Sequence, residues 1–157
     1  MRNLPRGLRD AIVDRGSLDR LERHGDFLAA DGTRKLRLRT LDGHFIESVL
    51  IPNDQRGYTL CVSSQVGCSM TCRFCATASL GFTRNLDTWE IVDQVEQAQD
   101  LVEAAAAAHD ATDLEPDARP RRLTNLVYMG MGEPLHNFNQ VKRSVDCLLY
   151  TSPSPRD

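Results

Sequence analysis

Three cysteines, Cys68, Cys72 and Cys75, lie so close together in the sequence that they must share one loop. Three thiolates at this spacing can ligate three irons of a cubane iron–sulfur cluster, one fewer than the four cysteines of an electron-transfer cluster. The fourth iron stays open, so a small molecule can bind it through its own nitrogen and oxygen atoms and receive an electron. The spacing therefore predicts a loop for radical chemistry.

A zinc site and a disulfide are the alternatives to a cluster. Structural zinc sites need four ligands, usually in two separated pairs, and the next thiol upstream is Cys61. His44 and His136 could complete a zinc site only if the fold brought them to the cysteines. Because the sequence shows no secretory signal and no transmembrane run, we expect a reducing cytoplasm, which disfavours a disulfide. The spacing favours iron and sulfur.

Charge is distributed unevenly along the chain. Of 157 residues, 41% are hydrophobic, which is enough for one core. Residues 1–40 hold ten Lys or Arg against six Asp or Glu, whereas residues 87–117 hold ten acids and no Lys or Arg. A basic face toward phosphates is compatible with this asymmetry, but an arginine-rich segment is more often a solvated surface. Charge alone is weak support for an RNA partner.

Hydrophobic periodicity predicts a helical segment and then strands in the first part of the chain. Apolar residues recur at helical spacing over residues 4–27, which predicts one or two short helices. Strict alternation over residues 35–39 and a second apolar run over residues 45–51 predict a β-hairpin. A further strand over residues 58–62 ends just before the cysteines.

The second part of the chain reads as helix, strand and helix. Asp87 is a good N-cap, with Glu90 three residues on, and apolar residues from Trp89 to Ala105 predict a long amphipathic helix. A buried strand over residues 126–129 leads into a glycine loop, and another helix begins near residue 137 or 139. This order is the opening of a parallel α/β barrel, whose reactive loops follow the strands.

The glycine loop (residues 130–134) is the second candidate for chemistry. Without side chains at Gly130 and Gly132, a ligand could approach the backbone closely, and Glu133 could accept from an ammonium group. We interpret the loop as the grip on an amino group. An ordinary tight turn is the alternative.

Several segments resemble the bacterial RlmN and Cfr family of ribosomal RNA adenine methyltransferases, which are radical S-adenosylmethionine (SAM) enzymes. The resemblance spans about residues 4–146, and its motifs are residues 31–33, 47–52, 61–68, 72–77, 81–86 and 129–135. The RlmN branch, which methylates C2 of an adenosine in 23S rRNA and in certain tRNAs, resembles the chain best. The C8-specific Cfr branch stays an alternative, as does an iron–sulfur electron-transfer protein from another class.

The resemblance implies two cofactors, a [4Fe-4S] cluster and SAM. Cys68, Cys72 and Cys75 would ligate the cluster, with SAM chelating the unique iron. Gly132 and Glu133 would contact SAM. The fold that it implies is a partial radical-SAM (β/α) barrel.

Two further residues fall at catalytic positions of the family. Glu47 matches the proton acceptor, and its alternative role is a solvent-facing carboxylate on a strand. Cys61 matches the cysteine that resolves the covalent RNA adduct through a disulfide. Its alternative role is that of a small buried hydrophobe. The family's other cysteine, which carries the methyl group, has no match here, and Cys147 is not a substitute.

The resemblance also predicts partners and organisation. Partners would be 23S rRNA, tRNA and an electron donor such as flavodoxin or ferredoxin, with a cytoplasmic monomer and no membrane contact. We expect an accessory region over residues 1–57 and the start of the barrel over residues 58–146. Residues 147–157 back-translate into a sequencing adapter and are expected to be a non-native tail, so we expect a truncated fragment that is inactive alone.

Overall fold

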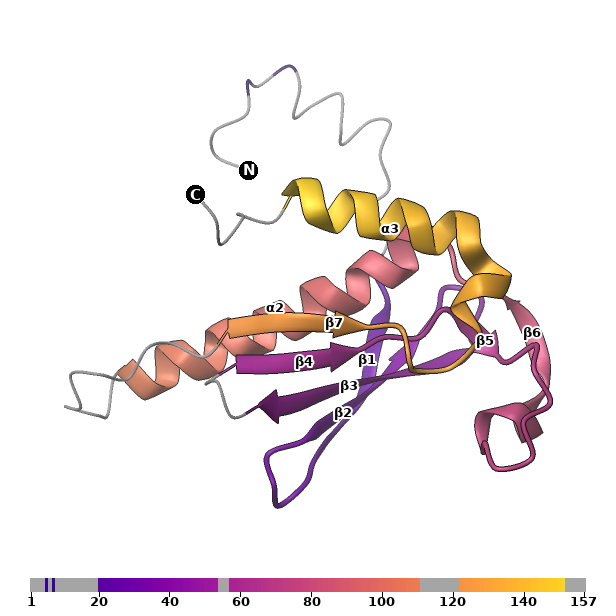
Figure 1. Ribbon diagram of the computed structural model, residues 1–157. Coiled ribbons are helices and arrows are strands. Elements are labelled where there is room, and N and C mark those ends of the chain that lie inside the picture. The colour runs from indigo at the N-terminus through magenta and orange to yellow at the C-terminus, as the bar shows by residue number, and fades with distance from the viewer. Residues whose placement is uncertain (1–4, 6, 8–19, 54–56, 111–121, 152–157) are drawn as a thin grey trace.

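The computed structural model describes Pro5, Gly7 and residues 20–53, 57–110 and 122–151 (Figure 1). In these ranges a five-stranded mixed sheet, ordered β1-β2-β3-β4-β7, accompanies a two-stranded sheet of β5 and β6. The elements are β1 (Glu22–Leu28), β2 (Arg34–Arg39), β3 (Phe45–Asn53), β4 (Gly57–Cys61), β5 (Gln65–Gly67), η1 (Thr77–Leu80), β6 (Phe82–Asn85), α2 (Thr88–Asp110), β7 (Arg122–Val127), η2 (Pro134–Asn137) and α3 (Phe138–Thr151). The α/β class is confirmed.

The predicted hairpin is formed by β2 and β3, which pair in antiparallel register. Leu36 and Leu38 of β2 are fully buried, as is Ile46 of β3. The intervening Lys35 and Arg37 lie on the opposite face, because side chains alternate along a strand. One face of the sheet therefore carries the core and the other is open.

The helical prediction over residues 4–27 is wrong at its end, because Glu22–Leu28 forms strand β1. The rest of that segment lies almost wholly outside the described residues. β1 is an edge strand whose side chains are mostly exposed, so burial gave it no apolar alternation. Backbone pairing with β2 holds it, interrupted by a bulge between Arg23 and Gly25, and Arg34 Nε lies 2.6 Å from Asp26 Oδ1.

β4, α2 and β7 form a βαβ unit. Its two strands make the one parallel pairing among the residues that the structure describes. β4 pairs with β7 with Cys61 opposite Val127, and α2 crosses between them over one face of the sheet (Figure 1). A strand before the glycine loop is thus confirmed, but it ends at Val127 and none of its residues is buried, so the prediction of a buried strand over residues 126–129 is wrong in its burial and its end. Closure into a barrel stays a prediction.

The sheet-facing side of α2 is more polar than its apolar spacing predicted. Gln94, Gln97 and Asp93 are at most 7% exposed, whereas the predicted face residue Ala105 is exposed. Gln94 Oε1 accepts from the backbone N–H of Ser63 at 2.8 Å. Gln97 and Asp93 bond the carbonyl and the N–H of one residue, Leu21, at 2.7 and 2.8 Å. Each of these three buried side chains of α2 has a hydrogen-bond partner, as burial requires.

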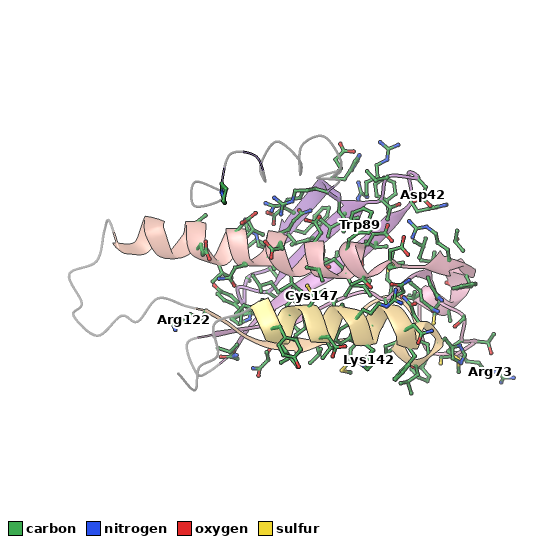
Figure 2. All side chains as sticks on the ribbon, turned by 90° about the horizontal axis from the view of Figure 1, so that it is seen from above. Asp42, Arg73, Trp89, Arg122, Lys142 and Cys147 are labelled. Atoms are coloured by element: carbon green, nitrogen blue, oxygen red, sulfur yellow. The ribbon has the colours of Figure 1, made fainter. Side chains whose placement is uncertain are left out.

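α3 lies beside α2, and Figure 2 shows both helices from above. Thr88, the first residue of α2, donates through its hydroxyl to Gln140 Oε1 of α3 at 2.6 Å. Among the residues that the structure describes, no helix is both long and apolar enough to cross a membrane.

Candidate functional site

The two loops singled out in the sequence lie at the same edge of the sheet. Because β4 and β7 are parallel, their carboxyl ends meet there. β4 leads into β5, and the cysteine loop (residues 68–81) then connects β5 to β6. β7 leads into the glycine loop. Arg73 of the cysteine loop and Arg122, the first residue of β7, lie toward opposite ends of the molecule in Figure 2.

Backbone hydrogen bonds join the glycine loop to the segment between β4 and β5. Gly130 N donates to the Val62 carbonyl at 3.0 Å, and Ser64 N donates to the Met131 carbonyl at 2.8 Å. The buried Ser63 hydroxyl accepts from Met131 N at 2.9 Å and donates to the Glu47 carbonyl at 2.6 Å. The loop is therefore held as firmly as a strand pair.

The two glycines are required by packing within the chain itself. A Cβ at Gly130 would lie 2.6 Å from the Val62 carbonyl oxygen, and one at Gly132 would lie 2.5 Å from Gln65 Cβ. Gly132 also has a φ of 101°, which disfavours other residues. Their close approach to β4 and β5 explains the glycines, and contact with a ligand stays a prediction.

Glu133 caps the short helix η2. Its Oε1 accepts from Leu135 N at 3.0 Å, and its own N–H donates to Gln65 Oε1 at 3.0 Å. The carboxylate is partly exposed, so its second oxygen can face a cation from the solvent side. This geometry is compatible with the predicted role in holding an amino group.

Cys68, Cys72 and Cys75 are all half-buried free thiols on the cysteine loop. Cys68 Sγ accepts from Met70 N at 3.4 Å. Backbone N–H groups of Ala78 and Thr77 bond Cys75 and hold the pKa of its thiol below the ordinary value. N–H donors toward cysteine sulfur favour the thiolate, which is the form that binds metal.

The donor set fits an iron–sulfur cluster in its chemistry, since three soft sulfur ligands share one loop and two of them receive backbone N–H groups. The structure does not gather them into one group: among the described residues, no three His, Cys, Asp or Glu side chains are close enough to hold a metal ion. His136 does reach the loop, with Nδ1 2.8 Å from Ser69 Oγ.

Glu47 and Cys61 lie on the open face of the sheet. Val49 pairs with Cys61, so Glu47, two residues before Val49, is a diagonal neighbour of Cys61 on that face. Glu47 Oε1 lies 3.1 Å from Lys35 Nζ. Burial raises the pKa of the Cys61 thiol, and a hydrogen bond from Met129 opposes this more weakly. The fold thus brings the two predicted catalytic residues together, with Cys61 kept protonated.

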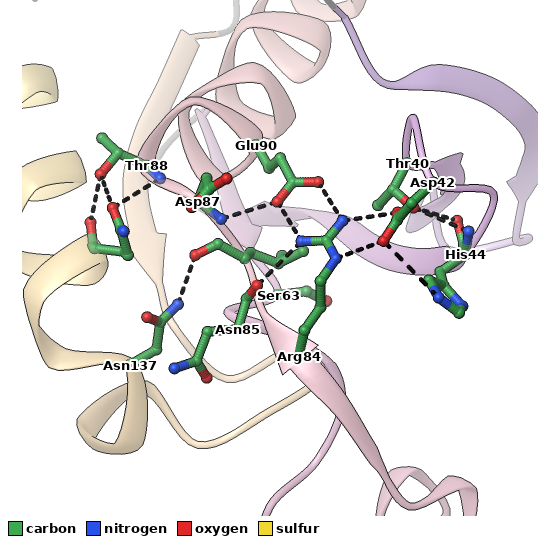
Figure 3. A network of polar contacts seen from close by, with 12 residues as sticks. Thr40, Asp42, His44, Ser63, Arg84, Asn85, Asp87, Thr88, Glu90 and Asn137 are labelled. Atoms are coloured by element: carbon green, nitrogen blue, oxygen red, sulfur yellow. Dashed lines mark hydrogen bonds and ion pairs between the residues drawn. The ribbon is translucent and has the colours of Figure 1, made fainter.

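The return strand of the cysteine loop is anchored by a residue that the sequence analysis did not single out. Arg84 of β6 lies between two carboxylates, with Nη1 2.7 Å from Glu90 Oε2 and Nε 2.7 Å from Asp42 Oδ2 (Figure 3). Glu90 also accepts from Asp87 N at 2.8 Å, which confirms the predicted capping pair. Two acidic partners raise the pKa of Arg84, so the guanidinium stays charged.

Asn137 and Gln65 are two other polar residues that were missed. Asn137 Nδ2 donates to the carbonyls of Ser64 and Leu86 at 2.8 Å each, which ties η2 to both β5 and the start of α2. Gln65 is 1% exposed. For Gln65 the available signal was the polar run of residues 63–65 directly after an apolar strand, where a solvated loop would be expected.

All five cysteines lie within the described residues, and none of them forms a disulfide there. The disulfide that the resemblance implies for Cys61 involves a second cysteine that has no match in this chain. Cys147 lines a shallow groove between α2 and α3 with Trp89 and Val92. That groove is formed by the helices, whereas the cysteine loop extends from β5 and β6 (Figures 1 and 2).

Comparison with known proteins gives strong matches. No family model matches the chain. "Dual-specificity RNA methyltransferase RlmN" of Anaeromyxobacter dehalogenans (strain 2CP-C) is 46% identical over 150 residues, which are 95% of this chain and 37% of the relative. The protein of the same name from Desulfotalea psychrophila (strain LSv54 / DSM 12343) is 51% identical over 122 residues, 76% of this chain and 31% of the relative.

A solved structure agrees with the sequence matches. The crystal structure of a radical SAM methyltransferase from Sphaerobacter thermophilus matches with a TM-score of 0.74 and 40% identity. The match covers 94% of this chain and 39% of that one, so the chain spans well under half of its relatives. The chain is therefore homologous, over most of its length, to the dual-specificity RNA methyltransferases named RlmN.

Proposed function

We propose that this chain carries the cofactor-holding region of a radical SAM enzyme that methylates C2 of an adenosine in 23S rRNA and in certain tRNAs. One observation carries the proposal: the glycine loop follows β7, the segment that leads to the cysteine loop follows the parallel strand β4, and the Ser64–Met131 backbone hydrogen bond of 2.8 Å joins that segment to the glycine loop. A cluster on one loop and SAM on the other would then be neighbours. Homology to RlmN supports the substrate class.

In this proposal Cys68, Cys72 and Cys75 hold a [4Fe-4S] cluster, which supplies an electron to SAM when both are bound. Gly132 would contact the amino acid end of SAM. Glu133 accepts from its ammonium group. The start of a radical-SAM barrel would surround both.

Glu47 and Cys61 act on the RNA side of the site. Glu47 accepts a proton from the substrate base, and its ion pair with Lys35, 3.1 Å between Oε1 and Nζ, orients the carboxylate along the open face. Burial raises the pKa of the Cys61 thiol, which would resolve the RNA adduct once it loses its proton. Its sulfur would attack the sulfur of a second cysteine that carries the adduct, so that a disulfide forms, the bond between that sulfur and the carbon on the base breaks, and the carbon takes up a proton. A flavodoxin or ferredoxin would donate the electron.

Anaerobic reconstitution of the chain with iron and sulfide tests the proposal. We expect an absorbance and EPR signal of a cluster that shifts when SAM is added, because SAM binds only an open iron. Cys72→Ala should lose the iron, while Cys147→Ala should keep it. A cluster that is indifferent to SAM and needs Cys147 would instead support an electron-transfer protein.

The two branches of the family are separated by the product. RNA from a reaction of the complete enzyme should contain 2-methyladenosine when its nucleosides are analysed by mass spectrometry. 8-Methyladenosine would favour the C8-specific alternative.

A further inference from the structure

Gln65 contacts both candidate loops with one side chain. Its Oε1 accepts from Ser69 N of the cysteine loop at 3.1 Å and from Glu133 N of the glycine loop at 3.0 Å. The Ser69 hydroxyl adds a third bond at 3.3 Å, and Gln65 Nε2 donates to Asn85 Oδ1 of β6 at 2.8 Å. One carbonyl oxygen therefore receives N–H groups from two loops that are far apart in the sequence.

The position of this side chain is tightly determined. Gln65 is 1% exposed, and a lost bond would leave the partly buried N–H groups of Ser69 and Glu133 without this acceptor. Its backbone N–H also bonds the Met131 carbonyl at 3.2 Å. Its Cβ lies where a side chain on Gly132 would have to go, with only 2.5 Å between them. The glycine loop and Gln65 therefore cannot move independently.

We propose that Gln65 is a positioning residue that couples the cysteine loop to the glycine loop, so that ordering one loop orders the other. The inference rests on the proposed function for its ligands, which are an iron–sulfur cluster and the amino acid end of SAM. Coupling of this kind is reciprocal: a cluster that fixes Ser69 strengthens SAM binding at Glu133, and SAM strengthens cluster retention.

Amide hydrogen exchange of the cofactor-free chain tests the coupling without any catalysis. Gln65→Met keeps the length and volume of the side chain but removes every acceptor. We expect exchange at Ser69 and Glu133 to accelerate together, roughly fivefold or more, because both amides lose their hydrogen bond to the same oxygen. Gln97→Met is the matched control, since Gln97 is also buried, at 4% exposed, but bonds the carbonyl of Leu21, which directly precedes β1.

Two more variants keep the test decisive if Gln65→Met unfolds. Gln65→Glu retains an oxygen acceptor and should keep both amides protected. Gly132→Ala pushes on Gln65 from the glycine loop and should accelerate exchange at Ser69, which Gly132 does not itself bond. Acceleration at Glu133 alone in Gly132→Ala, or equal acceleration in Gln97→Met, would overturn the proposal.

A second measurement separates this inference from the proposed function. In the reconstituted chain, Gln65→Met should bind a cluster but show a SAM-induced spectral shift only at roughly tenfold higher SAM, and Gln65→Glu should restore the response. A variant that responds to SAM like the unmodified chain overturns the coupling and leaves the function standing. If the unmodified chain ignores SAM, the proposed function fails and the exchange result still decides whether the loops are coupled.

Discussion

The glycine loop and the tip of the cysteine loop (residues 70–80) lie at the same edge of the sheet but are held very differently. The glycine loop bonds residues far away in the sequence, through Gly130, Met131 and Glu133. Among the described residues, the hydrogen bonds of the tip are local, such as the one from Cys75 N to the Cys72 carbonyl at 3.1 Å. Phe74 at the tip is 94% exposed. The comparison teaches that the glycine loop, the proposed SAM side, is fixed by long-range contacts, whereas the tip of the cysteine loop, the proposed metal side, is held by local bonds.

The largest loss of stability is expected when the ion pairs of Arg84, which anchor the return strand of the cysteine loop, are removed. Arg84→Met would leave Glu90, whose side chain is 2% exposed, as a buried unpaired carboxylate. We expect a loss of about 3 kcal/mol in the free energy of unfolding, measured in urea. Arg34→Met removes the more exposed pair with Asp26 and should cost at most about 1 kcal/mol. Equal losses in the two variants would contradict the buried anchor.

Steric overlap in the glycine loop should cause the next largest loss of stability. Gly130→Ala places a methyl group 2.6 Å from the Val62 carbonyl oxygen, and backbone cannot yield as a side chain can. We expect about 2 kcal/mol of destabilisation in thermal or urea unfolding. Phe74→Ser at the exposed tip should stay within about 0.5 kcal/mol. If the tip variant were the more damaging, the comparison of the two loops would be reversed.

Acid should weaken the anchor before it disturbs the glycine loop. Hydrogen bonds from Arg84 and then Thr40 lower the pKa of Asp42 well below its ordinary value. A depressed carboxyl pKa contributes stability that is fully present above roughly pH 4 and is lost as the pH falls toward the folded-state pKa. Unfolding free energies measured from pH 6 to pH 2 should therefore fall less steeply in Arg84→Met than in the unmodified chain. Parallel pH profiles would remove Asp42 from the anchor.

Thiol labelling should give the smallest but most local contrast. Backbone N–H groups lower the pKa of Cys75, whereas burial raises that of Cys61. At pH 8 a larger share of Cys75 is thiolate, so iodoacetamide should modify it several-fold faster than Cys61, as followed by peptide mass mapping. Labelling of both under denaturing conditions provides the control, since their rates should then converge. Faster reaction of Cys61 in the folded chain would contradict this assignment.

Elements that bury one face were predictable from the sequence, because burial of one face requires apolar residues at a regular spacing. The hairpin of β2 and β3 alternates, and α2 begins at its capping pair of Asp87 and Glu90. The common edge of the two loops followed from the strand–helix–strand order. Edge strand β1 was missed because pairing through the backbone leaves no pattern in exposed side chains.

The polar interior of the site could not be predicted in the same way. Gln65 and Asn137 are buried because single backbone groups from distant segments meet them, and no local spacing records such partners. Gly130 and Gly132 were singled out for ligand access, which stays a prediction, and the structure adds a packing reason that only the tertiary fold reveals. The resemblance in the motifs reached further than periodicity, since homology to RlmN is confirmed.

The polar contacts of α2 also restrict where this helix can sit. A helix packed by aliphatic groups alone can slip lengthwise on a sheet, since one methyl group replaces another. Asp93, Gln94 and Gln97 each match particular peptide groups, so a displacement of even one residue would strand several of them at once. The position of α2 along the sheet is therefore fixed. The relative placement of β4 and β7, and of the loops that follow them, depends on these buried polar side chains.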